Sequence, residues 1–227
     1  MSLERLLLWR HGRTEWNSLG RFQGQQDTAL DATGISQAQQ AAPYLAAEQP
    51  TAVYASDLGR AVATAQILAD LLGLTVHTDS RLRETSLGSW EGLDRAGVAE
   101  RFPQEFAAWT NGARSNPGDG EIALDVARRA NELVEQIARH EHGTVVLAAH
   151  GGSLKALTAS LIGMPESSWS LLAPLRNCHW TELRRTESGA WRLHAHNVFP
   201  LHNPRTLTVE ELNVDSDAGD DRINTPG

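Results

Sequence analysis

Two stretches, Arg5-Leu6-Leu7-Leu8-Trp9-Arg10-His11-Gly12 and Thr144-Val145-Val146-Leu147-Ala148-Ala149-His150-Gly151, share one pattern. In each, a short apolar run leads directly into a histidine followed by a glycine. Such a run, bounded by turn residues, is typical of a buried strand. The glycine lets the backbone pass close to a ligand. Because parallel strands end at the same edge of a sheet, we expect His11 and His150 to lie together at that edge.

The segments around these two strands alternate between helical and strand-like patterns. We expect helices over about 33–47, 56–72, 123–139 and 152–161. Further strands are expected over 52–55, 180–185 and 191–198. Ser56 or Asp57 is the expected cap of the second helix. The alternation predicts an α/β fold: a three-layer α/β/α arrangement with a mostly parallel central sheet, to which a late hairpin adds an antiparallel edge.

The interval of about 94–122 breaks this alternation. It carries Phe102, Phe106 and Trp109 at helical spacing and then a loop-forming run rich in glycine. We interpret it as a helical insertion that lids the edge where the two histidines meet. The length of 227 residues predicts one domain over 1–202. The remaining residues, 203–227, are expected to form an acidic and loosely ordered tail.

Composition and charge argue against several classes of protein. A net charge of −8 does not suit non-specific nucleic-acid binding, which needs a basic surface. No apolar stretch is long enough to span a bilayer, so no membrane partner is expected. The N-terminus lacks the pattern of a signal peptide, and the single cysteine excludes an intramolecular disulfide. We therefore expect a cytoplasmic protein, in which Cys178 is a small buried hydrophobic residue.

Four separated motifs contain the residues best suited to chemistry. They are Arg10-His11-Gly12-Arg13-Thr14-Glu15-Trp16-Asn17 with Arg21-Phe22-Gln23-Gly24, Ser56-Asp57-Leu58-Gly59-Arg60-Ala61 with Thr64-Ala65, Leu82-Arg83-Glu84 with Gly88-Ser89-Trp90-Glu91-Gly92, and Ala149-His150-Gly151-Gly152. In these motifs the chain resembles the histidine phosphatase superfamily, also called the phosphoglycerate mutase-like family. The resemblance covers about residues 6–198, and the joint occurrence of the four motifs in this order is highly specific.

The resemblance implies catalytic roles for five residues and phosphate contacts for four more. His11 would attack phosphorus through one ring nitrogen while the other donates to a backbone carbonyl. Arg10, Arg60 and His150 would surround the transferring group, whose charge spreads over three oxygens. Glu84 would protonate the leaving group. The positions that match phosphate contacts in relatives are Asn17, Gln23, Gly24 and Gly151.

Neither a metal nor another cofactor is expected. Guanidinium groups can neutralise phosphate charge without magnesium. The sequence also shows no aspartate-rich loop and no histidine cluster with metal-ligand spacing. Outside the motif context, Arg60 would be a surface ion-pair partner, and Glu84 would pair with Arg81 or Arg83.

Three functions fit these residues. The first is hydrolysis of a small phosphorylated metabolite, the second is a cofactor-dependent phosphoglycerate mutase, and the third is a non-catalytic relative that binds phosphorylated ligands. The third is the least favoured, because non-catalytic relatives usually lack the nucleophile or the acid, whereas all five catalytic residues are present here. A mutase binds a second phosphate through clustered cations, whereas the insertion offers only scattered arginines, namely Arg95, Arg101 and Arg114. The phosphatase branch is therefore favoured.

Within that branch the chain is most similar to actinobacterial glucosyl-3-phosphoglycerate phosphatases. The shared features are the Arg21–Gly24 segment, the Leu82–Thr85 segment that leads to Leu87-Gly88, and Asn177-Cys178-His179-Trp180-Thr181. The aromatic residues of the insertion suit stacking on a sugar ring. The expected partner is the small phosphorylated substrate, and the edge of the hairpin is a candidate interface for a homodimer.

Overall fold

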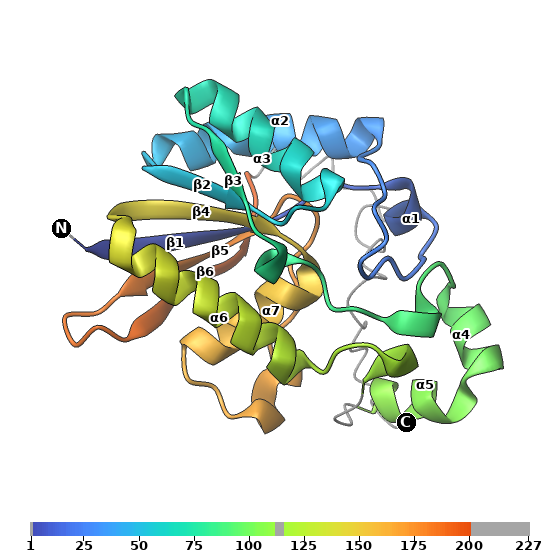
Figure 1. Ribbon diagram of the computed structural model, residues 1–227. Helices are drawn as coiled ribbons and strands as arrows, with labels where there is room; N and C mark the ends of the chain where they lie inside the picture. Colours follow the sequence, from blue (N-terminus) through green and yellow to red (C-terminus); the bar gives the residue numbers. More distant parts are fainter. Residues whose placement is uncertain (1, 112–115, 201–227) are drawn as a thin grey trace.

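The computed structural model describes residues 2–111 and 116–200 (Figure 1). The expected acidic tail, 203–227, lies outside the described residues. The strands are β1 (Leu3–Arg10), β2 (Ala52–Ala55), β3 (Val76–Thr78), β4 (Gly143–Ala149), β5 (Trp180–Arg185) and β6 (Trp191–Val198). The helices are α1 (Glu15–Ser18), α2 (Ala32–Ala47), α3 (Gly59–Leu72), α4 (Arg95–Arg101), α5 (Pro103–Thr110), α6 (Ala123–His140) and α7 (Gly151–Leu161). Short 3-10 turns are η1 (Ser80–Leu82), η2 (Gly88–Trp90), η3 (Pro117–Asp119) and η4 (Glu166–Leu171).

The six strands form one sheet in the order β3-β2-β4-β1-β5-β6. β1, β2 and β3 belong to the parallel part around β4, whereas β5 and β6 run antiparallel at one side. The mostly parallel sheet with an antiparallel edge is therefore confirmed. In the pairing of β1 with β4, Arg10 lies opposite Ala149. The residues that follow them, His11 and His150, consequently emerge at the same edge.

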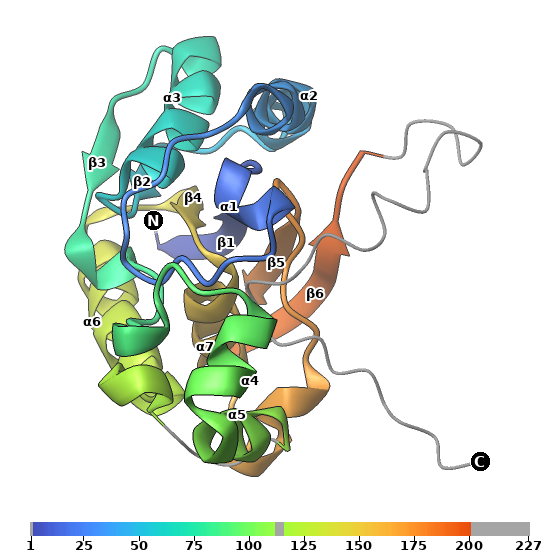
Figure 2. The same ribbon diagram turned by 90° about the vertical axis from the view of Figure 1, so that its right-hand side faces the viewer.

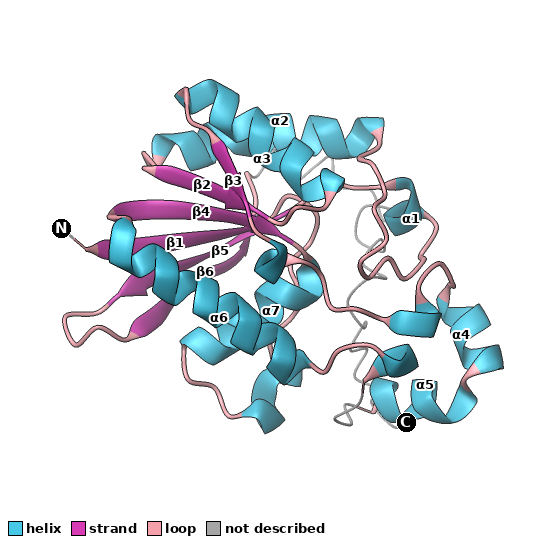
Figure 3. Ribbon diagram, viewed as in Figure 1, coloured by secondary structure: helices cyan, strands magenta, loops and turns pink. Residues whose placement is uncertain are grey.

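Helices cover both faces of the sheet, as the three-layer prediction requires (Figures 1 and 3). The alternation of β1 supplies both cores, because successive side chains of a strand point to opposite faces. Leu6 and Leu8 pack with α6 and α7, while Leu7 and Trp9 pack with α2 and α3. On α6 the buried positions recur every three or four residues, so one stripe of this helix faces the sheet.

The start of α3 differs from the prediction. Neither Ser56 nor Asp57 caps this helix, which begins at Gly59 without a side-chain cap from the preceding residue. The carboxylate of Asp57 instead binds Arg83 at 2.6 Å. The N–H of Gly59 donates to Asp27, 2.7 Å away. The prediction was wrong because the capping carboxylate comes from a segment 32 residues earlier in the chain.

The described part of the insertion contains two α-helices, because α4 ends before Pro103 and α5 begins there. Figure 2 views the molecule from the end at which α1 and α4 lie. Phe22 and Trp90 are fully buried, and further aromatic rings pack around them in a small separate core, namely Phe102, Phe106 and Trp109. The rings expected to stack on a sugar therefore pack largely against one another. Closure of the insertion over a ligand stays a prediction.

Membrane association was not expected from the sequence. Across residues 2–111 and 116–200, every helix is too short or too polar to cross a bilayer.

Candidate active site

His11 follows β1 directly and is almost completely buried. Its Nδ1 atom lies 2.7 Å from the carbonyl oxygen of Gly12. A carbonyl oxygen can only accept, so Nδ1 carries the proton and Nε2 keeps the lone pair. The main-chain oxygen of His11 is held in turn by the N–H of Cys178 and the side-chain amide of Asn177. The expected tautomer of His11 is therefore present.

His150 directly follows the last residue of β4 and is the N-cap residue of α7. Its ring centroid lies 5.1 Å from that of His11. Nδ1 of His150 accepts a hydrogen bond from Nε of Arg60 at 3.2 Å, so the proton of this ring is on Nε2. Among the described residues, Nε2 is buried and has no hydrogen-bond partner. A buried donor of this kind suits an oxygen atom of a bound ligand.

Burial and positive charge keep both rings neutral at pH 7. Burial first, and then the charges of Arg60 and Arg10, hold the pKa of His11 well below the usual value for histidine. Burial, Arg60, His11 and Arg10 lower the pKa of His150 in the same direction. A neutral imidazole is the form that can act as a nucleophile.

Two buried guanidinium groups concentrate positive charge at this edge of the sheet. Arg10 is the last residue of β1 and donates to the carbonyl oxygen of Leu175 at 2.5 Å. Arg60 lies in the first turn of α3 and donates to the carbonyl oxygens of Gln26 at 2.5 Å and Gly24 at 2.8 Å. Arg60 thus fixes the loop that contains Gly24 beside the two histidines, and it is no surface ion-pair partner.

Glu84 lies at the N-terminus of α7, and only 7% of its surface is exposed. Its two carboxylate oxygens accept backbone N–H groups from Gly152 at 2.9 Å, Ser153 at 2.8 Å and Thr85 at 2.7 Å. The first turn of a helix offers such donors and favours negative charge. The carboxyl group is thereby held next to His150, which immediately precedes this turn.

The alternative pairings of Glu84 do not occur. Arg81 binds Asp79 at 2.7 Å, and Arg83 binds Asp57 at 2.6 Å. The two arginines nearest to Glu84 in sequence therefore have other carboxylate partners. The carboxyl group of Glu84 therefore accepts hydrogen bonds from the backbone amides of α7 instead.

The two predicted carboxamide residues belong to one buried network. Oδ1 of Asn17 accepts from the N–H of Thr14 and from Nδ2 of Asn177. Oε1 of Gln23 accepts from the hydroxyl groups of Thr14 and Thr28. These bonds orient both side chains, with the oxygen on the Thr14 side and the NH₂ group opposite. Thr14 is therefore the residue that links the two.

The two predicted glycine contacts have different surroundings. Gly24 has a positive φ of 51°, and a Cβ atom there would collide with Glu91 at 2.2 Å. Its carbonyl oxygen faces Arg60. Gly151 begins α7, where a Cβ atom would lie 3.4 Å from Nε of Arg10. Both positions therefore bring backbone close to a buried arginine.

The structure brings all nine predicted residues into one connected group at the edge of the sheet. Sequence reasoning missed Asn177, which bridges His11 and Asn17. It also missed the amides of Gly152 and Ser153, although a helix start directly after His150 was a usable signal. Within the described ranges, no group of three or more histidine, cysteine, aspartate or glutamate side chains could hold a metal ion.

Comparison with known proteins agrees with this geometry. Residues 6–198 match the family model of the histidine phosphatase superfamily, branch 1. The chain belongs to the histidine phosphatase superfamily. The predicted enzyme class, a hydrolase of phosphate monoesters, is confirmed by this membership together with relatives that are named phosphatases.

Three relatives of this histidine phosphatase illustrate the range of the family. The glucosyl-3-phosphoglycerate phosphatase of Mycolicibacterium vanbaalenii is 42% identical over 191 residues, 81% of this chain and 85% of that protein. The structure of mycobacterial glucosyl-3-phosphoglycerate phosphatase with VO3 has a TM-score of 0.82 at 41% identity, and the match covers 86% of this chain and 99% of that one. A Yersinia pestis protein named "Probable phosphoglycerate mutase GpmB" is 35% identical over 185 residues, 80% of this chain and 85% of that protein.

The two buried histidines should make this histidine phosphatase less stable in mild acid. The unfolded chain takes up protons below about pH 6.5, whereas the folded state keeps both rings neutral. The free energy of unfolding should therefore fall between pH 6.5 and 5.5, by up to about 1.4 kcal/mol per pH unit for each ring. Urea denaturation at both pH values measures this fall. The double variant His11→Gln/His150→Gln should show a smaller one, and an equal fall in both proteins would contradict the account.

Gly152 should be required for the position of the Glu84 carboxyl group. A Cβ atom at Gly152 would lie 2.7 Å from Oε1 of Glu84 and 3.0 Å from Oγ1 of Thr85. Both contacts are ends of flexible side chains, so Gly152→Ala should fold and keep its thermal stability. It should nevertheless lower kcat/KM for an alkyl phosphate about 10-fold or more, and that for p-nitrophenyl phosphate much less, since a good leaving group needs little protonation.

A matched control for Gly152→Ala is Gly97→Ala, which adds a methyl group to the first turn of α4. This control should retain wild-type kcat/KM on both substrates. Equal losses on both substrates in Gly152→Ala would show that Glu84 is not placed by this contact.

Proposed function

We propose that the protein hydrolyses a phosphate monoester through a phosphohistidine intermediate on His11. The observation that carries the proposal is the neutral, buried ring of His11. Its Nδ1 proton is bound by Gly12, and its ring lies beside His150 and two buried arginines. A lone pair on Nε2 and a surrounding positive charge are what attack on a phosphate requires.

The reaction proceeds in two steps. In the first, Nε2 of His11 forms a bond to phosphorus, the bond from phosphorus to the alcohol oxygen breaks, and Glu84 gives that oxygen a proton. In the second, the oxygen of a water molecule forms a bond to phosphorus, the bond from phosphorus to Nε2 of His11 breaks and returns the lone pair to Nε2, Glu84 takes a proton from the water, and inorganic phosphate leaves. Arg10, Arg60 and Nε2–H of His150 stabilise the three equatorial oxygens in both steps.

Glu84 needs a proton before the first step. Two negative charges at short distance repel, so a bound phosphate dianion favours the protonated carboxyl group. The side-chain NH₂ groups of Asn17 and Gln23 and the backbone at Gly24 and Gly151 provide further phosphate contacts in this proposal. The arginines take the place of a metal ion, so activity should survive chelators.

For the substrate, we propose glucosyl-3-phosphoglycerate, because two similar proteins are named as phosphatases of this compound.

The described part of the insertion favours a phosphatase over a mutase. The guanidinium group of Arg95 lies over the rings of Phe106 and Trp109, and that of Arg101 lies over Phe102. These arginines pack on aromatic rings rather than cluster around a second phosphate site. Arg114 lies outside the described residues.

We further propose that the protein is located in the cytoplasm. A homodimer that forms through the edge of β6 stays a prediction.

The first test is to trap the intermediate. Mixing with substrate and rapid quenching in alkali should yield an acid-labile phosphoenzyme in the wild type and none in His11→Ala. His194→Ala, which removes an exposed histidine, should be labelled like the wild type. Wild-type turnover in His11→Ala, or loss of activity with EDTA and rescue by magnesium, would contradict the proposed mechanism.

A second test distinguishes a phosphatase from a phosphoglycerate mutase. The protein is supplied with 3-phosphoglycerate and catalytic 2,3-bisphosphoglycerate, while 2-phosphoglycerate and inorganic phosphate are measured. We expect slow phosphate release from 3-phosphoglycerate and fast release from its glucosylated form, because the proposed leaving group includes the sugar. Isomerisation faster than phosphate release would assign the protein to the mutases.

A further inference from the structure

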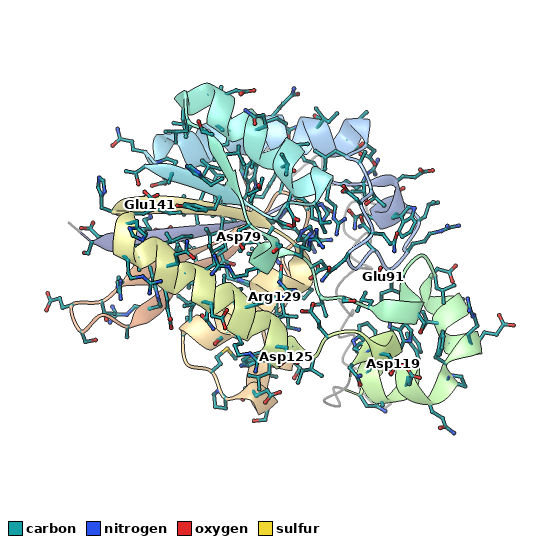
Figure 4. All side chains as sticks on the ribbon, viewed as in Figure 1. Asp79, Glu91, Asp119, Asp125, Arg129 and Glu141 are labelled. Atoms are coloured by element: carbon teal, nitrogen blue, oxygen red, sulfur yellow. The ribbon has the colours of Figure 1, made fainter. Side chains whose placement is uncertain are left out.

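Arg129 binds the segment that leads to Glu84. It lies on α6 (Figure 4). Its side chain is only 17% exposed. Nη1 donates to the carbonyl oxygen of Arg81 at 2.7 Å, and Nη2 donates to that of Glu84 at 3.0 Å. One rigid guanidinium group therefore holds both ends of this four-residue segment.

Glu121 continues this contact on the other side of Glu84. It accepts Nε and Nη2 of Arg129 at 2.9 Å each, which is a bidentate ion pair. Its Oε2 atom also accepts the N–H of Ser86 at 2.9 Å, and its own N–H donates to the oxygen of Ser86 at 2.8 Å. Burial by itself would raise the pKa of Glu121. The hydrogen bonds from Arg129 and from the N–H of Ser86, together with the charge of Arg129, outweigh burial and leave this pKa below its usual value. The side chain is thus a stable anion.

The same region has no space for a larger residue beside Ser86. A Cβ atom at Gly120 would lie 1.9 Å from the carbonyl oxygen of Ser86 and 3.0 Å from Cα of Leu87. The backbone at the end of the insertion therefore packs directly against the backbone that follows Glu84. Gln25 adds a further hydrogen bond, in which its Nε2 donates to the main-chain carbonyl oxygen of Glu84 at 3.2 Å.

We propose that Glu121 and Arg129 form a positioning pair that fixes the main chain around Glu84, so that its carboxyl group meets the leaving oxygen. This inference rests on the proposed role of Glu84 and adds two residues to it. Neither residue touches the phosphate in the proposed mechanism, and both act through the acid.

The pair matters because the carboxyl group has to present its proton to the leaving oxygen. Both oxygens of Glu84 accept backbone N–H groups of α7 and Thr85 in the structure. An oxygen that accepts one N–H group can still carry a proton. The position of the main chain at residues 81, 84 and 86 therefore sets where that proton lies. An error of about 1 Å in placement can cost about 100-fold in rate.

The experiment compares Arg129→Gln and Glu121→Gln with the wild type on an alkyl phosphate and on p-nitrophenyl phosphate. Each variant should lower kcat for the alkyl phosphate by about 10-fold or more and leave KM nearly unchanged, while p-nitrophenyl phosphate loses less than about 3-fold. Arg129→Lys should not rescue the activity, because an ammonium group cannot reach two carbonyl oxygens and a carboxylate in the geometry of the fork.

A matched control is Arg128→Gln on the same helix. Arg128 pairs with Asp125 at the surface and is 67% exposed, so its loss should change neither substrate. The double variant Glu84→Gln/Arg129→Gln provides a second readout. A residue that acts only through Glu84 adds no further loss on the alkyl phosphate once Glu84 is replaced.

The outcomes separate this inference from the proposed function. If Glu84→Gln itself shows no dependence on the leaving group, the proposed acid is wrong and the inference with it. If Glu84→Gln shows that dependence but Arg129→Gln slows both substrates equally, or adds its full loss to Glu84→Gln, the pair is merely structural. Should Arg129→Gln fail to fold, Glu121→Gln decides, since its amide can still accept the N–H of Ser86 while the ion pair is lost.

Discussion

The active site depends on the parallel pairing of β1 with β4. Their register places Arg10 opposite Ala149, and the chain leaves both strands at the same edge. His11 and His150 therefore meet with ring centroids 5.1 Å apart, although 139 positions of sequence separate them. Backbone hydrogen bonds between the two strands set this geometry independently of the side-chain contacts. Apolar side chains on both faces of β1 then lock the strand between two layers of helices.

Burial of polar groups at this edge of the sheet costs free energy, and the same burial sets the protonation state of the two histidines. Two histidines and two arginines lie almost completely out of water. Desolvation disfavours the charged form of each imidazole, and the neighbouring guanidinium groups act in the same direction. The result is a pair of neutral rings in a positive environment, one with a lone pair and the other with a proton to donate. The same burial that is expected to lower stability in acid keeps the proposed nucleophile, His11, neutral at pH 7.

The carboxyl group of Glu84, the proposed acid, is held from two sides by different elements. The first turn of α7 binds the carboxyl group of Glu84, while Arg129 and Glu121 bind the main chain around it. Glu121 also ends the insertion, whose other contacts form a separate aromatic core. The insertion is thereby tied to the catalytic edge through backbone contacts at Gly120.

The sequence alone was enough to predict β1, β2, β4, β5 and β6, together with the histidines and motif residues near their ends, because those signals are local. It did not predict β3, a strand of three residues with no buried side chain. The hydrogen-bond partners came only from the tertiary structure. Asp27 rather than Asp57 caps α3, Glu84 binds the amides of α7 rather than Arg81 or Arg83, and Asn177 bridges His11 and Asn17. These bonds join residues 32, 69 and 160 positions apart. Several carboxylates and amides in the chain could accept a hydrogen bond from the same donor. The packing of the helices against the sheet determines which of them lies within hydrogen-bond distance.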